Sequence, residues 1–192
     1  LSGYADTWNG VSSDVSWYSE SDTEFHIKRA AQLKGLSDLV KEGHSFEGKI
    51  VYLDDDIDLN TNSWRPIGGN YRNSTVFNGT FDARNHKVIN VCPKVTDSPY
   101  YGMHSYGLFG VAGSKSIIRN LSVSGGVAIY AQELDGMVYA GGIAGSSSGK
   151  IENVHSKFNI SASDKSNRDI PTLYAGGVCG DGNEITLAQS SG

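Results

Sequence analysis

The sequence of 192 residues is poor in proline, in cysteine and in long hydrophobic runs. No apolar run approaches the ~18 residues that a membrane-spanning helix requires, so we expect no insertion into a membrane. Basic residues are also in the minority, because 16 Lys and Arg stand against 21 Asp and Glu, for a formal net charge of −5. Nucleic acids and anionic membrane surfaces attract basic proteins, so we expect neither as a partner.

The two cysteines, Cys92 and Cys179, lie far apart in segments of different character. Free cysteines are usually buried, so we favour two small buried apolar residues. A disulfide between them is the alternative, because the sequence alone does not give their distance. The chain begins LSGYADTW, without an initiator methionine or a signal peptide, and we therefore expect a processed product or part of a longer chain.

Glycine, in contrast, is abundant, with 24 residues beside only four prolines. This combination argues against collagen or a disordered linker and indicates many tight turns in an ordered chain. Three glycine-framed stretches read GLFG, GGIAG and GGVCG, and they end at Gly110, Gly145 and Gly180, at intervals of 35 residues. The chain therefore contains an internal repeat.

Each repeated unit holds short strand-like runs and no helical pattern. Ile118 and Asn120 in the first unit match Ile151 and Asn153 in the second, and KFNIS then completes that unit. Repeats of fixed period indicate a solenoid, in which each coil buries its apolar face against its neighbours. We predict an all-β fold, a parallel β-helix over residues 46–192. The repeat glycines are expected where stacked coils leave no room for side chains or where φ is positive.

One segment has the period of a helix instead. Apolar residues recur at steps of three and four between Ile27 and Val40, and we predict a helix over residues 24–42 that ends at Gly43.

The start of this helix has a capping signature. Ser21 or Asp22 would cap the first turn, and Glu24 would complete a capping box. We expect residues 1–45, an extended segment and this helix, to cover the first coil and to pack with the β-helix as one domain.

The sequence holds no arrangement typical of a catalytic site, so we predict a non-enzymatic protein without a cofactor. The five histidines are scattered, with no spacing typical of zinc ligands. The densest acidic stretch, DDDID, places Asp56 and Asp58 on one strand face, where they are a weak candidate for binding Ca²⁺. We favour the alternative, a solvated turn with capping carboxylates, and therefore predict no metal site.

Tyrosines are the better candidates for binding. The stretch SPYYGMHSYG makes Tyr100 and Tyr101 our candidate ligand-binding residues, because exposed tyrosines stack on sugars or form protein-binding patches. Tyr139 and Tyr174 occupy equivalent positions of the repeat, so we expect a structural ladder there. We interpret the asparagines of four N-x-[ST] triplets as turn and ladder residues rather than glycan acceptors. They are Asn73, Asn78, Asn120 and Asn159.

The segments GLFG…IIRNLSVSG and YAGGIAGSSSGKIENVHSK resemble the GLUG repeat family, whose units read roughly G-G-L-hydrophobic-G, a short turn and I-x-N. Upstream, the segments FHIKRAAQLKGLSDLVKEG, GKIVYLDDDIDL, WRPIGG and FNGTFDARNHKVINV are similar to the region that precedes these repeats in bacterial surface proteins. The chain departs from the family at Ala83-Arg84-Asn85-His86, which replaces glycines, but Asn85 can still adopt the left-handed conformation.

This resemblance implies a right-handed β-helix and a large secreted or wall-anchored bacterial protein. The repeat motif of the family carries no catalytic residues, so none is transferred to this chain. We therefore expect an extracellular or cell-surface module, monomeric and part of a longer chain, that binds glycans or host proteins as an adhesin does. The alternatives are a carbohydrate-active β-helix domain and a purely structural spacer.

Overall fold

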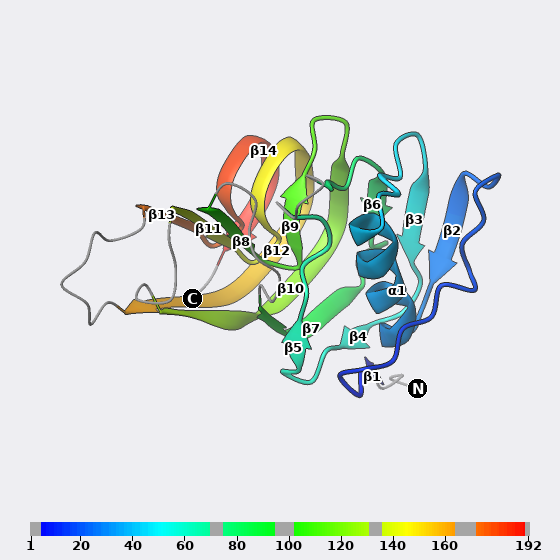
Figure 1. The fold of residues 1–192 in the computed structure, drawn as a ribbon, viewed down its shortest axis with the longest axis horizontal. Coiled ribbons are helices and arrows are strands. Elements are labelled where there is room, and N and C mark those ends of the chain that lie inside the picture. Colours follow the sequence, from blue (N-terminus) through cyan, green and yellow to red (C-terminus); the bar gives the residue numbers. More distant parts are fainter. Residues whose placement is uncertain (1–4, 70–74, 95–101, 131–135, 164–171, 191–192) are drawn as a thin grey trace.

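The computed structural model describes residues 5–69, 75–94, 102–130, 136–163 and 172–190. Strands make up 54% of it and form a parallel β-solenoid, which confirms the all-β solenoid predicted from the repeat (Figure 1). The elements are β1 (Asp6–Thr7), β2 (Glu24–Ile27), α1 (Ala30–Lys41), β3 (Ile50–Leu53), β4 (Ile57–Asp58), β5 (Ser63–Trp64), β6 (Thr80–Asp82), β7 (Lys87–Pro93), β8 (Met103–Tyr106), β9 (Phe109–Ala112), β10 (Ile117–Tyr130), β11 (Met137–Gly141), β12 (Ala144–Ser163), β13 (Thr172–Gly176) and β14 (Cys179–Ser190).

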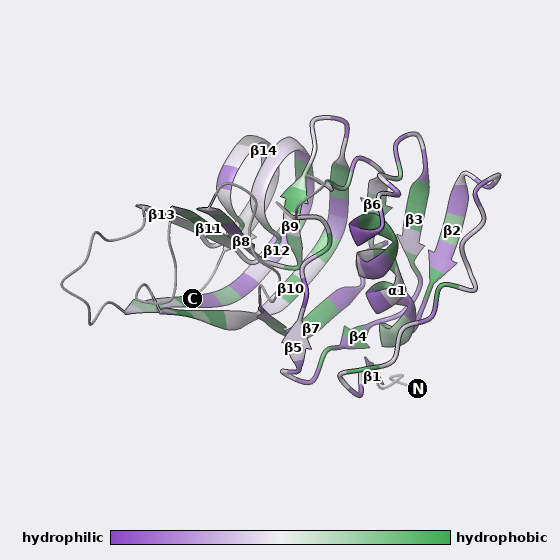
Figure 2. Cartoon of the chain, viewed as in Figure 1, coloured by the Kyte–Doolittle hydropathy of each residue, from purple (hydrophilic) through white to green (hydrophobic). Residues whose placement is uncertain are grey.

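One side of the solenoid is a ladder of strands from successive coils. The strands β2, β3, β6, β10, β12 and β14 pair in this order, and each pair is parallel. One inward-facing apolar side chain of each strand lies in register with that of the next. This inward ladder consists of Phe25, Val51, Phe81, Ile118, Ile151 and Ile185. Stacking removes the first five of these side chains from water, and hydrophobic and hydrophilic residues accordingly alternate along the strands (Figure 2).

The other sides of the coils are parallel as well. β4 pairs with β7, β7 with the second half of β10, and β8, β11 and β13 form a separate three-stranded sheet. The long strands β10 and β12 bend around corners of the solenoid without losing their pairing (Figure 1). Asn120 and Asn153 lie at these corners with φ angles of 55° and 49°, a conformation that asparagine tolerates better than most residues.

The repeat glycines lie where neighbouring backbones come too close for a side chain. A Cβ atom on Gly145 would lie 2.9 Å from the amide nitrogen of Tyr106, and one on Gly180 would lie 2.6 Å from that of Ala140. A Cβ on Gly110 would lie 2.2 Å from a carbonyl oxygen of the preceding coil. None of these three glycines has a positive φ. Steric exclusion, and not left-handed backbone, therefore explains why the repeat requires glycine here.

The structure contains the predicted helix, but the helix begins six residues later than we predicted. Residues Glu24–Ile27 form β2, with Phe25 and Ile27 buried and their neighbours exposed. Pairing with β3 holds this segment extended, because both inward side chains then join the solenoid core. α1 begins only at Ala30, after the N-cap residue Arg29.

The caps explain both ends of α1. The predicted capping box of Ser21 and Glu24 is wrong, because Arg29 is the N-cap residue and its amide donates to Oε1 of Gln32 at 3.2 Å. The predicted end at Gly43 is confirmed. Gly43 has a φ of 108°, its amide donates to the carbonyl of Val40 at 3.0 Å, and the next amide donates to the carbonyl of Leu39. These bonds form a Schellman motif.

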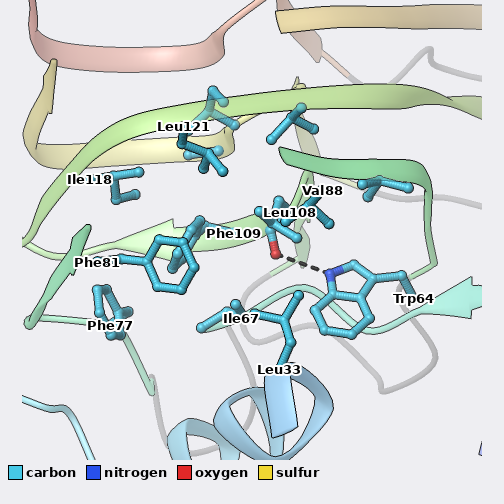
Figure 3. Packing of buried hydrophobic residues seen from close by; sticks show 14 of the residues in the cluster. Leu33, Trp64, Ile67, Phe77, Phe81, Val88, Leu108, Phe109, Ile118 and Leu121 are labelled. Atoms are coloured by element: carbon cyan, nitrogen blue, oxygen red, sulfur yellow. Dashed lines mark hydrogen bonds between the residues drawn. The ribbon is translucent and has the colours of Figure 1, made fainter. Parts of the chain in front are cut away.

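Buried side chains from α1 and from the coils belong to one hydrophobic cluster. Figure 3 shows Leu33 of α1 reaching toward Ile67, with Trp64 beside them. The indole Nε1 of Trp64 donates to the carbonyl of Leu108 at 3.0 Å, so this large buried ring leaves no polar atom unsatisfied. The helix thus shares its core with the solenoid.

Candidate binding surfaces

The predicted ligand-binding residues Tyr100 and Tyr101 lie outside the described residues. The described chain resumes at Gly102 and enters β8 at Met103, at the edge of the three-stranded sheet β8–β11–β13. In the sequence, these two tyrosines therefore directly precede a strand of this sheet.

Two other tyrosines lie side by side on the same sheet. Tyr139 of β11 and Tyr174 of β13 are partners in the parallel register, and their rings stack with centroids 5.1 Å apart and an interplanar angle of 11°. The structural ladder predicted from the repeat is therefore confirmed. Tyr139 and the neighbouring Met137 point away from the core, whereas Val138 between them is fully buried.

We call Met137, Tyr139 and Tyr174 the tyrosine row. Tyr174 is 44% exposed and Met137 37% exposed. The Tyr139 hydroxyl donates to Sδ of Met137 at 3.4 Å. Burial, together with the nearby Tyr174 and Asp181, raises the pKa of Tyr139, so its hydroxyl stays protonated at neutral pH. The row offers aromatic edges, one free ring face on Tyr174 and hydroxyl groups.

A second surface lies on the strands of the inward ladder, on their outer side. We call it the polar face, and its members are in register from β2 to β12. They are His26, Tyr52, Asp82, Arg119 and Glu152. Neighbours along the row interact: the His26 and Tyr52 rings stack with centroids 5.0 Å apart, and Arg119 Nε lies 2.9 Å from Asp82 Oδ2. Arg119 Nη1 also lies 4.0 Å from Glu152 Oε1.

Residues beside the polar face complete these pairs. Asp54 accepts a hydrogen bond from Arg84 Nη1 at 2.8 Å, and its other oxygen lies 2.7 Å from His26 Nδ1. The Arg84 guanidinium lies over the Tyr52 ring, 4.1 Å from its centroid. β2 and β6 flank β3, so Tyr52 contacts one partner from each side. Its ring is thereby engaged by protein groups.

Asp82 is the most buried acid of the polar face, with its side chain 11% exposed. Burial alone would raise the pKa of Asp82, but hydrogen bonds from the Asn120 side chain, the Arg84 amide and Arg119 outweigh it and lower the pKa. Asn120 Nδ2 donates to Asp82 at 2.9 Å, and Asn153 Nδ2 donates to Oδ1 of Asn120 at 2.7 Å. This ladder accords with our interpretation of Asn120 as a structural asparagine.

The weak calcium candidates already have other partners. Asp56 Oδ1 lies 3.1 Å from His86 Nδ1 and accepts the Lys87 amide at 3.1 Å. Asp58 Oδ1 accepts the Asn60 amide at 2.7 Å and Asn90 Nδ2 at 2.8 Å. A cation would have to replace these donors. In the part of the chain that the structure describes, no three His, Cys, Asp or Glu side chains gather as metal ligands would.

The two cysteines are separate, half-buried thiols. Cys92 lies on β7 and Cys179 at the start of β14. Burial is the largest cause that raises the pKa of Cys179, to about 11, and its Sγ donates to the Asp181 carbonyl at 2.8 Å. A thiol of such high pKa is a poor nucleophile, so Cys179 packs rather than reacts.

Sequence reasoning missed the polar face. Its members His26, Tyr52 and Asp82 come from coils of unequal length, so no fixed spacing connects them. Only Arg119 and Glu152 stand at matching positions of the repeat, beside the asparagines that we did identify. The acidic stretch DDDID was the one sequence signal for this surface, because its Asp54 contacts His26 and Arg84.

No protein-family model matches the chain, and no solved structure matches it. The chain is similar to a protein of Evansella cellulosilytica that bears the name Gly-rich membrane protein, with 29% identity over 139 residues. The alignment spans 69% of this chain and 14% of that protein. No helix among the described residues has the length and apolar composition needed to cross a membrane.

Proposed function

We propose that this chain is a non-enzymatic binding module of a bacterial secreted or cell-surface protein, with glycans or host proteins as ligands. The observation that carries the proposal is the tyrosine row, an aromatic surface built on a rigid parallel sheet. Stacking between Tyr139 and Tyr174 fixes both rings before any ligand arrives, which lowers the entropy cost of binding. The free face and edges of Tyr174 suit the apolar faces of sugar rings or of protein side chains.

We also propose the handedness of the solenoid, the type of its repeat and the role of its helix. We assign the solenoid a right-handed winding, the GLUG type of repeat and an N-terminal cap made by α1. The position of α1 beside the first coils supports the cap (Figure 1). The Ala30 amide at the start of α1 donates to Asp6 of β1 at 2.7 Å, so the helix is tied to the chain that precedes it.

A cell-surface location rests on the relative. Its name places that protein at a membrane, and the aligned stretch is a small part of it. A solenoid module within a longer surface protein is consistent with both facts.

The chemistry of the polar face supports a non-enzymatic role. A carbohydrate-active β-helix needs carboxylates free to act as acid, base or nucleophile. Asp54 and Asp82 contact arginines, and Glu152 lies 3.1 Å from Lys150 Nζ. Protein donors therefore occupy these carboxylates, and the hydrogen bonds to Asp82 also lower its pKa, which makes it a poor general acid.

A structural spacer is the second candidate. The stacked tyrosines favour it, since a ladder of this kind also stabilises a solenoid without any ligand. The two functions differ in one property, which is measurable binding at the tyrosine row.

The test is a glycan-array and mucin-binding screen of the wild type beside three variants. The variants are Tyr139→Ala/Tyr174→Ala, Tyr100→Ala/Tyr101→Ala and, as a tyrosine control on the other sheet, Tyr52→Ala. Binding by the wild type and by Tyr52→Ala, with at least about a tenfold loss in Tyr139→Ala/Tyr174→Ala, supports the proposal, since tenfold corresponds to about 1.4 kcal/mol.

The remaining results discriminate between the alternatives. Loss in the Tyr100→Ala/Tyr101→Ala variant alone places the binding surface on the insertion before β8. Absence of binding by the wild type to every glycan and mucin contradicts the binding module and leaves the spacer. Thermal melts of all four proteins verify that each variant is folded.

A further inference from the structure

The last rung of the inward ladder is uncovered. Ile118 and Ile151 are 0% exposed, whereas Ile185, which lies in register with Ile151, is 44% exposed. All three side chains occupy the same inward position. Ile185 differs in having a neighbouring coil on one side only.

In the three-stranded sheet, the exposure of inward side chains also rises at the last strand. Val138 of β11 is 0% exposed, but its partner Leu173 of β13 is 38% exposed. Ala140 is fully buried, and its partner Ala175 is exposed. Inward-facing positions on two different sides of the solenoid thus open at the same coil.

The strand edges agree with the side chains. Among the described residues β13 pairs only with β11, and β14 pairs only with β12. One edge of each strand therefore carries backbone donors and acceptors with no strand beside them. Such edges pair readily with an added strand.

At the opposite end β2 also pairs with only one described strand, β3, but its inward side chain is covered. The rings of Trp17 and Tyr18 each lie 5.4 Å from that of Phe25, which is 3% exposed although it belongs to the first strand of the inward ladder. Among the described residues, inward side chains are therefore uncovered at the end formed by Leu173, Ile185 and the free edges of β13 and β14, which we call the open end.

We propose that this open end is a docking surface for one further β-solenoid coil, whose strands pair in parallel with β13 and β14. The occupant would place an apolar residue over Ile185 and another over Leu173. A coil near 35 residues long fits, because Leu173 follows its partner Val138 by that interval.

A coil fits better than a second copy of this chain. Every described strand pair is parallel, whereas two copies joined at their open ends by a two-fold axis would have to pair β14 with β14 in antiparallel fashion. Head-to-tail stacking is blocked, because Trp17 and Tyr18 cover the other end. The aligned stretch is 14% of the similar protein of Evansella cellulosilytica, so a chain of that kind is long enough to hold additional coils.

The test compares the 192-residue chain with an extended chain, in which a second copy of residues 144–178 is inserted after Val178. The insertion adds one repeat in register and covers the original Leu173. In the 192-residue chain Leu173→Asp should lower Tm by less than about 3 °C, because water still reaches the site. In the extended chain the same substitution buries a charge and should lower Tm by more than about 10 °C.

Two control substitutions accompany it. Val138→Asp, at the equivalent inward position that is already covered, should be strongly destabilising in both chains. Val11→Asp, at a residue 80% exposed, should change neither.

Three outcomes would overturn the proposal. An extended chain that melts below the parent, or in which Leu173→Asp stays harmless, would mean that the open end does not accept a coil. A Leu173→Asp effect in the parent as large as that of Val138→Asp would mean that this end is already covered. Sedimentation equilibrium that finds the parent dimeric, and Leu173→Asp monomeric, would assign the surface to a second copy.

Discussion

The ladder of inward side chains runs to both ends of the solenoid, but its two terminal side chains differ in their exposure to water. Phe25, on the first strand of the ladder, is 3% exposed, because aromatic rings from the preceding segment cover it. Ile185, on the last strand, is 44% exposed. Both ends are therefore equally apolar in sequence, and only one is sealed. A repeat therefore predicts how coils stack on each other but not how the stack is terminated.

The two ends also differ in regularity. Near the closed end, Val51 follows Phe25 by 26 residues and Phe81 follows Val51 by 30, whereas Ile185 follows Ile151 by 34. At the closed end, the aromatic residues Trp17 and Tyr18 contact Phe25. Near the open end, coils of similar length stack on each other, and the repeat glycines let their backbones approach closely.

The largest difference is expected between two identical substitutions at ladder positions. Ile151→Ala should lower the free energy of unfolding by about 2–5 kcal/mol, because it leaves a cavity between two coils. Ile185→Ala should cost less than about 1 kcal/mol, since its side chain is already partly in water. Urea denaturation of both variants measures this. Equal losses would contradict the open end.

Alanine substitutions at two glycines of the last coils should also differ in the stability that they cost. Gly145→Ala places a Cβ 2.9 Å from the Tyr106 amide nitrogen, and we expect a loss of about 1–3 kcal/mol from the clash with backbone. Gly182→Ala meets only side-chain atoms, of which the nearest is Cδ1 of Ile185 at 3.1 Å, and this flexible chain end can move aside. Its cost should stay within about 0.5 kcal/mol. Chemical denaturation that ranks Gly182→Ala as the worse variant would refute the steric explanation of the repeat.

Asn120 should matter for its backbone and for its amide group separately. Asn120→Ala loses the bond to Asp82 and forces alanine into a φ of 55°, for a combined loss of about 2 kcal/mol. Asn120→Gly keeps the backbone conformation without strain and should lose about 1 kcal/mol. Thermal melts of the pair distinguish these causes, and identical melting temperatures would show that the left-handed turn carries no strain.

The smallest effect is a pH dependence. The lowered pKa of Asp82 stabilises the fold at pH values above the unfolded value of about 3.9, and this stabilisation is lost as pH falls through the folded value. Asp82→Asn should therefore be less stable at neutral pH and should lose less stability on acidification. Asp55→Asn, at an exposed residue, is the control. Melting temperatures between pH 7 and pH 3 that fall in parallel for Asp82→Asn and the wild type would contradict this.

Much of the fold could be predicted from the sequence, because repetition is a strong signal. The solenoid, the steric role of Gly145 and the stacking of Tyr139 on Tyr174 all follow from positions that recur. The start of α1 could not be located, because Ile27 satisfies both a helical period and the alternation of a strand. Only its pairing with β3 decides between them.

The candidate surfaces were harder to predict than the fold. Tyr100 and Tyr101 lie outside the described residues, and the tyrosine row was interpreted as structural only. Contacts such as those of Asp54 with His26 and Arg84 join residues about thirty positions apart in irregular coils, and no sequence period reveals them. Sequence patterns identify what stacks, and side-chain pairing across unequal coils needs the structure.

The most direct test of a solenoid closed at one end and open at the other is native-state hydrogen exchange on the 192-residue chain. We expect the amides of β6 and of the first half of β10 to exchange slowest, through global unfolding, because strands lie on both sides of them. The amides of β13 and β14 should exchange fastest among the strands. Protection of β14 equal to that of β6 would show that this end of the solenoid is covered, since an uncovered edge cannot be as stable as the centre of the ladder.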